Sequence, residues 1–366
     1  MKPYTQTTLS ALFAACALAF SLPAAAYTQK DVEQYDQAWE MSKQQNYKTA
    51  FDLLQQPALN GYAEAQSQLG YLYEYGKGVA QDYSQAAYWY QKAAEQGFVT
   101  AQYNLGTMYF RGLGGVPLDL NQTISWWTKA AQQGDAQAQA NLGALYHKGH
   151  AVPRDYAKAF YWLQKAAQQG NDQGEFGLGV IYDFGHGVKQ DYAQAAKWYL
   201  RAAQQGYADA QDNLGGLYYR GHGVKQDYAQ AMQWYLKAAQ QGHAKAQYNI
   251  GVLYERGRGV KQDYAQAMQW YLKAAQQDHA DALYSVGALY GRGYGVKQDY
   301  TQAMQWLQKA ANKGHNKANY IIGELYRTGS GVKQDLKQAR YWYEQAARQG
   351  YKEAVDKLKK LNRKQR

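Results

Sequence analysis

The sequence predicts an all-α protein, a right-handed superhelical α-solenoid of stacked antiparallel helix pairs. Three observations lead to this prediction. An apolar residue followed by glycine, with tyrosine three residues after the glycine, recurs at a nearly constant spacing. Tryptophan recurs at the same spacing. The segment GVKQDYAQAMQWYLKAAQQ occurs twice without a change, at 223–241 and at 259–277.

The two recurring columns set the length of the repeat. Successive members of each column lie 36 residues apart, except for one gap of 37, between Gly106 and Gly143 in one column and between Trp89 and Trp126 in the other. The glycines are Gly70, Gly106, Gly143, Gly179, Gly215, Gly251, Gly287 and Gly323. The tryptophans are Trp89, Trp126, Trp162, Trp198, Trp234, Trp270, Trp306 and Trp342. A period of this length is typical of repeat proteins, in which each unit buries its apolar face against its neighbours.

Residues 1–26 have the pattern of a signal peptide. Lys2 supplies a positive start, an apolar run from Leu9 to Leu22 follows, and Ala24–Ala26 are small residues suited to cleavage. We therefore expect an exported protein, located in the periplasm or secreted. An alternative is a lipoprotein anchored through Cys16, but the apolar run continues past that cysteine.

Cysteine content and charge limit the classes of partner. Cys16 is the only cysteine, so a chain cleaved after residue 26 has no disulfide bonds. The formal net charge is +11, and it becomes +10 without Lys2. A basic balance favours acidic partners, such as an acidic protein, an anionic glycan or a lipid surface. Export argues against nucleic acid as a partner.

The chain divides into four segments. After the signal peptide, residues 27–61 read as a divergent helix pair that caps the N-terminal end. Residues 62–350 hold eight repeats of about 36 residues. Residues 351–366 form a basic amphipathic helix, which either caps the C-terminal end or touches an anionic membrane. We see no linker and no second domain.

Each repeat reads as two helices, and residues 208–242 are a representative copy. The first helix carries an apolar stripe at helical spacing and ends at Gly221 and Gly223, because glycine adopts the left-handed conformation that closes helices. Asp227 caps the second helix, and Gln230 completes a capping box. Gly242 ends this helix. The glycine in the middle of the first helix predicts an approach of a neighbouring helix too close for a side chain.

These motifs resemble a known repeat. The pattern AQYNLGTMYFRG, followed by Gly-Val-x-x-Asp-Tyr and QWYLKAAQQGHAKAQ, resembles the Sel1-like repeat, a relative of the tetratricopeptide repeat. The resemblance implies a binding scaffold that assembles or regulates complexes. It also implies that exported bacterial members act in host contact, envelope processes or neutralisation of another protein. A cysteine-rich branch is linked to penicillin binding, but this chain lacks those cysteines.

Two columns on the first helices are candidate binding residues, because the first helices of related repeats line the concave wall. The amides are Asn104, Asn141, Asn213 and Asn249. Amides both donate to and accept from a peptide backbone, but they can equally bond neighbouring helices and support the stack. The cations are Arg111, Lys148, Arg220, Arg256 and Arg292. They form either a stripe that binds carboxylates or a solvated face.

Other residues carry weaker signals. No catalytic motif occurs, and we expect no cofactor and no metal site. His243, His279 and His315 recur at the start of first helices and are interpreted as exposed, and the tryptophan column is interpreted as core. The sequence therefore predicts a non-enzymatic exported scaffold that binds a protein or peptide, possibly an acidic one, on its concave surface. The alternatives are a binder of cell-wall or anionic envelope polymer and, less favoured, a penicillin-reactive hydrolase.

Overall fold

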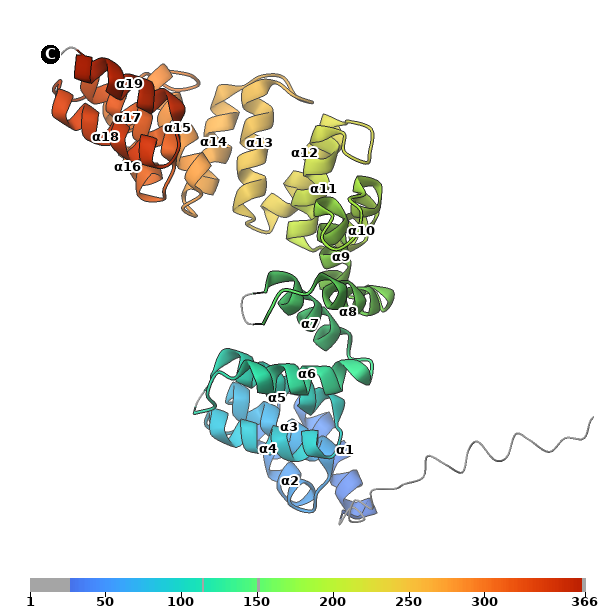
Figure 1. Cartoon of the computed structure of the whole chain (residues 1–366). Helices are drawn as coiled ribbons and strands as arrows, with labels where there is room; N and C mark the ends of the chain where they lie inside the picture. The colour runs from blue at the N-terminus through green and yellow to red at the C-terminus, as the bar shows by residue number, and fades with distance from the viewer. Residues whose placement is uncertain (1–26, 114, 150–151, 364–366) are drawn as a thin grey trace, which may run out of the picture. The chain divides into compact units, whose positions relative to one another are not determined.

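The computed structural model describes residues 27–113, 115–149 and 152–363 as nineteen helices without a strand. The described residues form two compact units, one up to residue 166 and one from residue 167 onward, and the boundary falls in the last turn of α8. The predicted signal peptide and Cys16 lie outside the described residues. The prediction of an all-α fold of stacked helix pairs is confirmed (Figure 1).

Unit 1 holds the first eight helices. They are α1 (Gln29–Lys43), α2 (Tyr47–Leu59), α3 (Ala63–Tyr75), α4 (Tyr83–Glu95), α5 (Val99–Arg111), α6 (Leu120–Gln132), α7 (Ala136–Lys148) and α8 (Tyr156–Gln168). The segment 27–61 is thus a helix pair, α1 and α2, joined by a short turn.

Unit 2 holds the remaining eleven helices. They are α9 (Asp172–Phe184), α10 (Tyr192–Gln204), α11 (Ala208–Arg220), α12 (Tyr228–Gln240), α13 (Ala244–Arg256), α14 (Tyr264–Ala275), α15 (Ala280–Arg292), α16 (Tyr300–Asn312), α17 (Asn316–Thr328), α18 (Leu336–Arg348) and α19 (Lys352–Arg363). From α3 onward, odd-numbered helices up to α17 are the first helices of the repeats, and even-numbered helices are the second ones.

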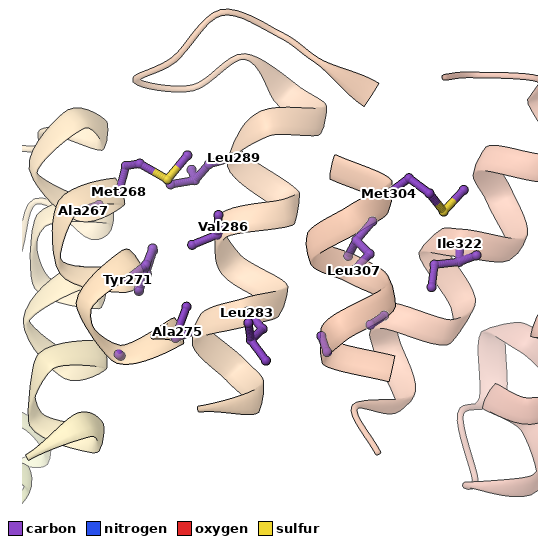
Figure 2. Packing of buried hydrophobic residues seen from close by; sticks show 14 of the residues in the cluster. Ala267, Met268, Tyr271, Ala275, Leu283, Val286, Leu289, Met304, Leu307 and Ile322 are labelled. Carbon is purple, nitrogen blue, oxygen red and sulfur yellow. The ribbon is translucent and has the colours of Figure 1, made fainter. Parts of the chain in front are cut away.

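The core of each unit lies between successive helices. The second helix of each pair, apart from α8, packs against the first helix of its own pair and against the helix that follows it, as α14 does against α13 and α15. Figure 2 shows this arrangement for α14–α17, where Met268 faces Leu289, and Leu307 lies close to Met304 and Ile322. Burying an aliphatic side chain of this size contributes roughly 1.5–3 kcal/mol. Each pair therefore depends on its neighbours for stability.

The recurring mid-helix glycine is explained by the second helix of the same pair. A Cβ atom on Gly215 would lie 2.8 Å from the ring of Tyr235, and one on Gly251 would lie 2.5 Å from the ring of Tyr271. Contacts below 3.0 Å are not tolerated without movement. The predicted close approach of helices is confirmed, and the residue that demands it is the large side chain on the second helix.

Helix capping follows the sequence only in part. Asp227 caps α12 by accepting hydrogen bonds from the backbone N–H groups of Ala229 and Gln230, both at 2.9 Å. Equivalent aspartates cap α4, α6, α10, α14, α16 and α18. The predicted capping box is wrong for α12, because no bond returns from the Gln230 side chain to Asp227. Among the described helix caps, a complete box occurs in α1, between Thr28 and Asp31.

The recurring histidines are half-buried helix caps, so their interpretation as exposed residues is wrong. His243, His279 and His315 precede α13, α15 and α17, and each Nδ1 accepts a backbone N–H at 3.1–3.3 Å. The Nε2 atom of His243 lies 3.0 Å from Asp209 and that of His315 lies 3.3 Å from Asp281. A ring nitrogen accepts a hydrogen bond only while it is unprotonated.

Acidification is therefore expected to destabilise unit 2 in two steps. Burial lowers the pKa of His279 below its ordinary value of 6.5, so the unfolded chain binds the extra proton first and stability falls as the pH drops through about 6.5. Hydrogen bonds from His243 and His315 lower the pKa of Asp209 and Asp281, so their contribution is lost only below pH 3.8. Urea unfolding at pH 7.5 and 5.5 measures the first step.

A His279→Asn variant serves as the control for this prediction. Asparagine is a strong helix cap that does not titrate, so the variant should lose less stability than the native chain between these pH values. The expected difference is about 1 kcal/mol, the usual cost of a lost cap. An equal acid loss in both chains would contradict the role of His279.

A buried amide network links successive pairs, and the sequence analysis did not identify it. Gln211 is 4% exposed, donates to the Ala203 carbonyl of α10 at 3.0 Å and accepts from Gln241 at 3.0 Å. Gln66, Gln102, Gln139 and Gln247 make the equivalent donation to an alanine carbonyl. These glutamines stand two positions before the asparagine column, and their recurrence was the available signal. They support the stack in the way that was considered for the asparagines, and Asn249 of α13 does so as well by donating to Asp212 of α11.

The tryptophan column lies at the edge of the core. Trp89 and Trp234 are buried, but the others are half-buried. The Lys237 Nζ atom lies 4.0 Å from the ring centroid of Trp234, and Lys273 and Lys309 cover Trp270 and Trp306 in the same way. The interpretation of this column as core is thus correct for two positions and too simple for the rest.

The C-terminal helix α19 packs its apolar side against the last repeat. Ala354 is buried and Leu358 contacts the cluster around Tyr343, while Lys357 pairs with Glu324 at 2.8 Å. This apolar side is therefore occupied by the fold, which disfavours membrane contact through α19. Within the described residues, no helix combines the length and apolar character that crossing a bilayer requires.

Candidate functional site

Two adjoining pockets run along the first helices of unit 2. The α11–α13 pocket has a volume of about 370 Å³, and the α13–α15 pocket has a volume of about 440 Å³. Tyr248, Val252 and Arg256 of α13 line both pockets, so the two adjoin at α13, and we call them together the groove. Most lining residues come from α11, α13 and α15, which are the helices that the sequence analysis placed on the inner wall.

Three of the predicted cations lie along the groove. Arg220 and Arg256 line the α11–α13 pocket, and Arg256 and Arg292 line the α13–α15 pocket. All three are exposed, and none forms an ion pair with a carboxylate within the described residues. Arg256 donates to the hydroxyl of Tyr219 at 3.1 Å. The guanidinium groups are thus available to an acidic ligand.

The carboxylates of the groove are, in contrast, mostly occupied. Asp183 accepts a hydrogen bond from the Tyr199 hydroxyl at 3.1 Å, and Glu255 accepts one from Tyr271. Burial raises the pKa of both tyrosines, so they remain donors at neutral pH. Internal hydrogen bonds therefore occupy these carboxylates, whereas the three arginines have no carboxylate partner among the described residues and can bind one.

Asp212 is the groove residue that the sequence analysis missed. It is 2% exposed, pairs with the Lys245 amine at 2.8 Å and accepts from the Asn249 amide at 2.8 Å. The signal was present in the alignment of the repeats. The equivalent residues are Ser67, Tyr103, Ala140, Phe176, Tyr248, Tyr284 and Tyr320, so α11 alone carries a charge there.

The remaining predicted site residues separate between the two units. Asn213 and Asn249 line the α11–α13 pocket, where the amide nitrogen of Asn249 is used by Asp212. The others belong to unit 1. Asn104 and Asn141 are half-buried there, Asn141 accepts from Gln137 at 3.1 Å, and Arg111 and Lys148 are exposed at helix ends. The structure thus brings together the members of both columns that lie on α11, α13 and α15.

The described residues contain no group of three or more histidine, cysteine, aspartate or glutamate side chains placed to hold a metal ion. The groove offers hydrogen-bond donors, carboxylates and aromatic rings in an open surface. This arrangement suits binding of an extended ligand.

Comparison with known proteins follows the same repeats. The sequence profile of the Sel1 repeat matches residues 63–98, 99–135, 136–171, 173–207, 208–243, 244–279, 280–315 and 316–351. No protein with a curated description matches the chain.

Two solved structures are similar over most of the chain. One is a protective antigen present in uropathogenic Escherichia coli strains, described as displaying an SLR fold, with 38% identity and a TM-score of 0.74 over 84% of this chain. This chain spans 66% of that protein's length, slightly less than two thirds. The other is a Sel1 repeat protein from Oxalobacter formigenes, with 33% identity and a TM-score of 0.66, covering 91% of this chain and 94% of that one.

Proposed function

The chain belongs to the Sel1 repeat family, and on that premise we propose that it is an exported, non-enzymatic scaffold that binds a protein or peptide partner along the groove of unit 2. Sel1 repeat proteins generally mediate protein–protein interaction, and their fold is typically a non-catalytic scaffold. Export rests on the signal-peptide pattern of residues 1–26.

The unpaired arginines of the groove carry this proposal. Arg220, Arg256 and Arg292 end three successive first helices and line two adjoining pockets. A guanidinium group binds a carboxylate through two parallel hydrogen bonds, so a row of them favours a partner with acidic residues along an extended segment.

The partner can be captured in intact cells with a photoreactive residue. We expect substitution at Ala288, a half-buried residue in the α13–α15 pocket, to yield a specific crosslinked protein. The same substitution at Gln305, exposed on the second helix α16 of that repeat, is the matched control. Crosslinks of equal yield from both positions would contradict binding in the groove.

Charge reversal then tests the arginines. Changing Arg220, Arg256 and Arg292 together to glutamate should weaken binding of the captured partner about tenfold or more, because three attractive contacts become repulsive. The measurement is the dissociation constant by fluorescence anisotropy, with the fold checked by circular dichroism.

A second triple variant separates local contacts from overall charge. Lys225, Lys261 and Lys297 lie exposed in the loops of the same repeats, and reversing them alters the net charge by the same amount. Their reversal should change affinity little. Equal losses of affinity in both triple variants would show that the partner binds a nonspecific basic surface and not the groove, as expected for a binder of anionic polymer.

A further inference from the structure

In four repeats of unit 2, the second helix carries a tyrosine at the same position, and in one of these repeats the surroundings of the tyrosine differ. In three pairs, an aromatic residue of the first helix covers this tyrosine. The pairs of ring centroids are Phe176–Tyr199 at 5.8 Å, Tyr248–Tyr271 at 5.5 Å and Tyr320–Tyr343 at 5.7 Å. In the fourth pair, α11 presents Asp212 where the covering ring would stand, so Tyr235 of α12 has no such cover.

The same three tyrosines also have hydrogen-bond acceptors that Tyr235 lacks. Their hydroxyl groups donate to Asp183, Glu255 and Glu324, respectively. In α11 the residue equivalent to Asp183 and Glu255 is Tyr219, which offers no carboxylate. Tyr235 is only 4% exposed and lines the α11–α13 pocket, yet its hydroxyl has no hydrogen-bond partner among the described residues.

The charges around the pocket define what this hydroxyl can bind. Asp212 is neutralised by Lys245 and held by Asn249, so it leaves little capacity for a cationic ligand. Arg220 lines the same pocket and has no carboxylate partner within the described part of unit 2. The free groups are therefore donors, namely one phenol and one guanidinium, and the ligand that complements both is a carboxylate.

We propose that the α11–α13 pocket is a specific subsite for an aspartate or glutamate side chain of the partner, bound by the Tyr235 hydroxyl and the Arg220 guanidinium. This inference rests on the proposed function and adds a defined contact to it. In an array of similar repeats, an extended partner can bind in several registers. A subsite found at one repeat of unit 2 favours the register that places a carboxylate there.

The test uses the full mature chain and two labelled peptides. One peptide carries four glutamates between Gly-Ser flanks, and the other carries four glutamines in their place. We expect anisotropy titrations to show binding of the glutamate peptide and at least tenfold weaker binding of the glutamine peptide, because charge-assisted hydrogen bonds are lost.

Two variants then isolate the subsite. Tyr235→Phe removes only the hydroxyl and keeps the ring against Gly215, so we expect about tenfold weaker binding of the glutamate peptide with an unchanged fold. Asp212→Tyr introduces the residue that four other repeats of the chain carry and covers Tyr235 as Tyr248 covers Tyr271. It should fold at least as well as the native chain and bind similarly weakly.

Tyr343→Phe is the matched control, because it removes an equivalent hydroxyl that is already bonded to Glu324, and neither residue lines the groove. It should leave peptide binding unchanged. If the triple arginine reversal weakens binding but Tyr235→Phe and Asp212→Tyr do not, the subsite is refuted while the proposed function stands. If the native chain does not distinguish the two peptides, both the subsite and an acidic groove ligand are refuted.

Discussion

Replacing Gly223 by alanine is expected to destabilise unit 2 by about 3 kcal/mol or more, within the range of severe single substitutions. Gly223 has φ +69°, and a Cβ atom there would lie 2.2 Å from the carbonyl carbon of Tyr192 at the start of α10. Backbone cannot move aside as a flexible side chain does. The loop after α11 would therefore have to separate from the preceding pair, which opens the contact between two repeats.

Gly242→Ala provides the control for this substitution. Gly242 also has a positive φ, +87°, but no atom lies within 4 Å of the position of its Cβ. We expect a loss of about 1–2 kcal/mol, the cost of the left-handed conformation alone. The chain itself supports this expectation, because Asp278 stands one repeat later in the same place with φ +61°.

Urea unfolding of both variants measures the difference, and hydrogen exchange locates it. Protection should fall first in α10, α11 and α12, since repeats interact mainly with their neighbours. Equal losses of stability in Gly223→Ala and Gly242→Ala would show that the close contact with Tyr192 has no energetic importance.

Replacing Arg201 by alanine is expected to cost about 2–3 kcal/mol, because it leaves a buried carboxylate without its cation. Glu175 on α9 is 1% exposed, and its Oε1 atom lies 2.6 Å from the Arg201 guanidinium. Gln205 donates to the other carboxylate oxygen at 2.8 Å. We place the expected loss below that of a fully buried pair because the Arg201 side chain is 44% exposed.

The repeats suggest a compensating change. Glu175 stands in the column that holds Gln211 and Gln247, so Glu175→Gln supplies the amide that the other repeats use. The single variant should be neutral or slightly stabilising, and the double variant should lose less than Arg201→Ala alone. The double-mutant cycle also subtracts the contact of Arg201 with Trp198, whose ring centroid is 5.0 Å away. Additive losses would contradict a stabilising ion pair.

The helix pairs, their boundaries and the aspartate caps were predictable because each depends on residues within a few positions. Asp227 caps α12 through the next two or three backbone N–H groups, and Gly221 closes α11 with φ +72°. The constant repeat length itself predicted that the helix pairs stack, because repeats that contact nearly identical neighbours can have nearly identical sequences. The sequence also predicted that another helix approaches the mid-helix glycine closely, but it did not show which side chain of the second helix makes the contact.

The candidate site was predictable only as a set of columns. Arg220, Arg256 and Arg292 were found by counting residues, but residue order did not show that they lack carboxylate partners while Asp183 and Glu255 are occupied. Asp212 was visible as an exception in its column, yet its meaning depends on Lys245 and Asn249 in the following repeat. The histidine caps were misjudged because their ring contacts also reach across repeats.

The amino-acid sequence was thus sufficient to predict the all-α repeat, its length and its family, because local hydrogen bonds and periodic burial depend on residues that lie close together in the chain. Only the stacking of the helix pairs determined which charged side chains remain unpaired and which tyrosine has no aromatic ring packed against it. Those properties arise between side chains about one repeat apart in the chain, and their distances exist only once the helices have packed.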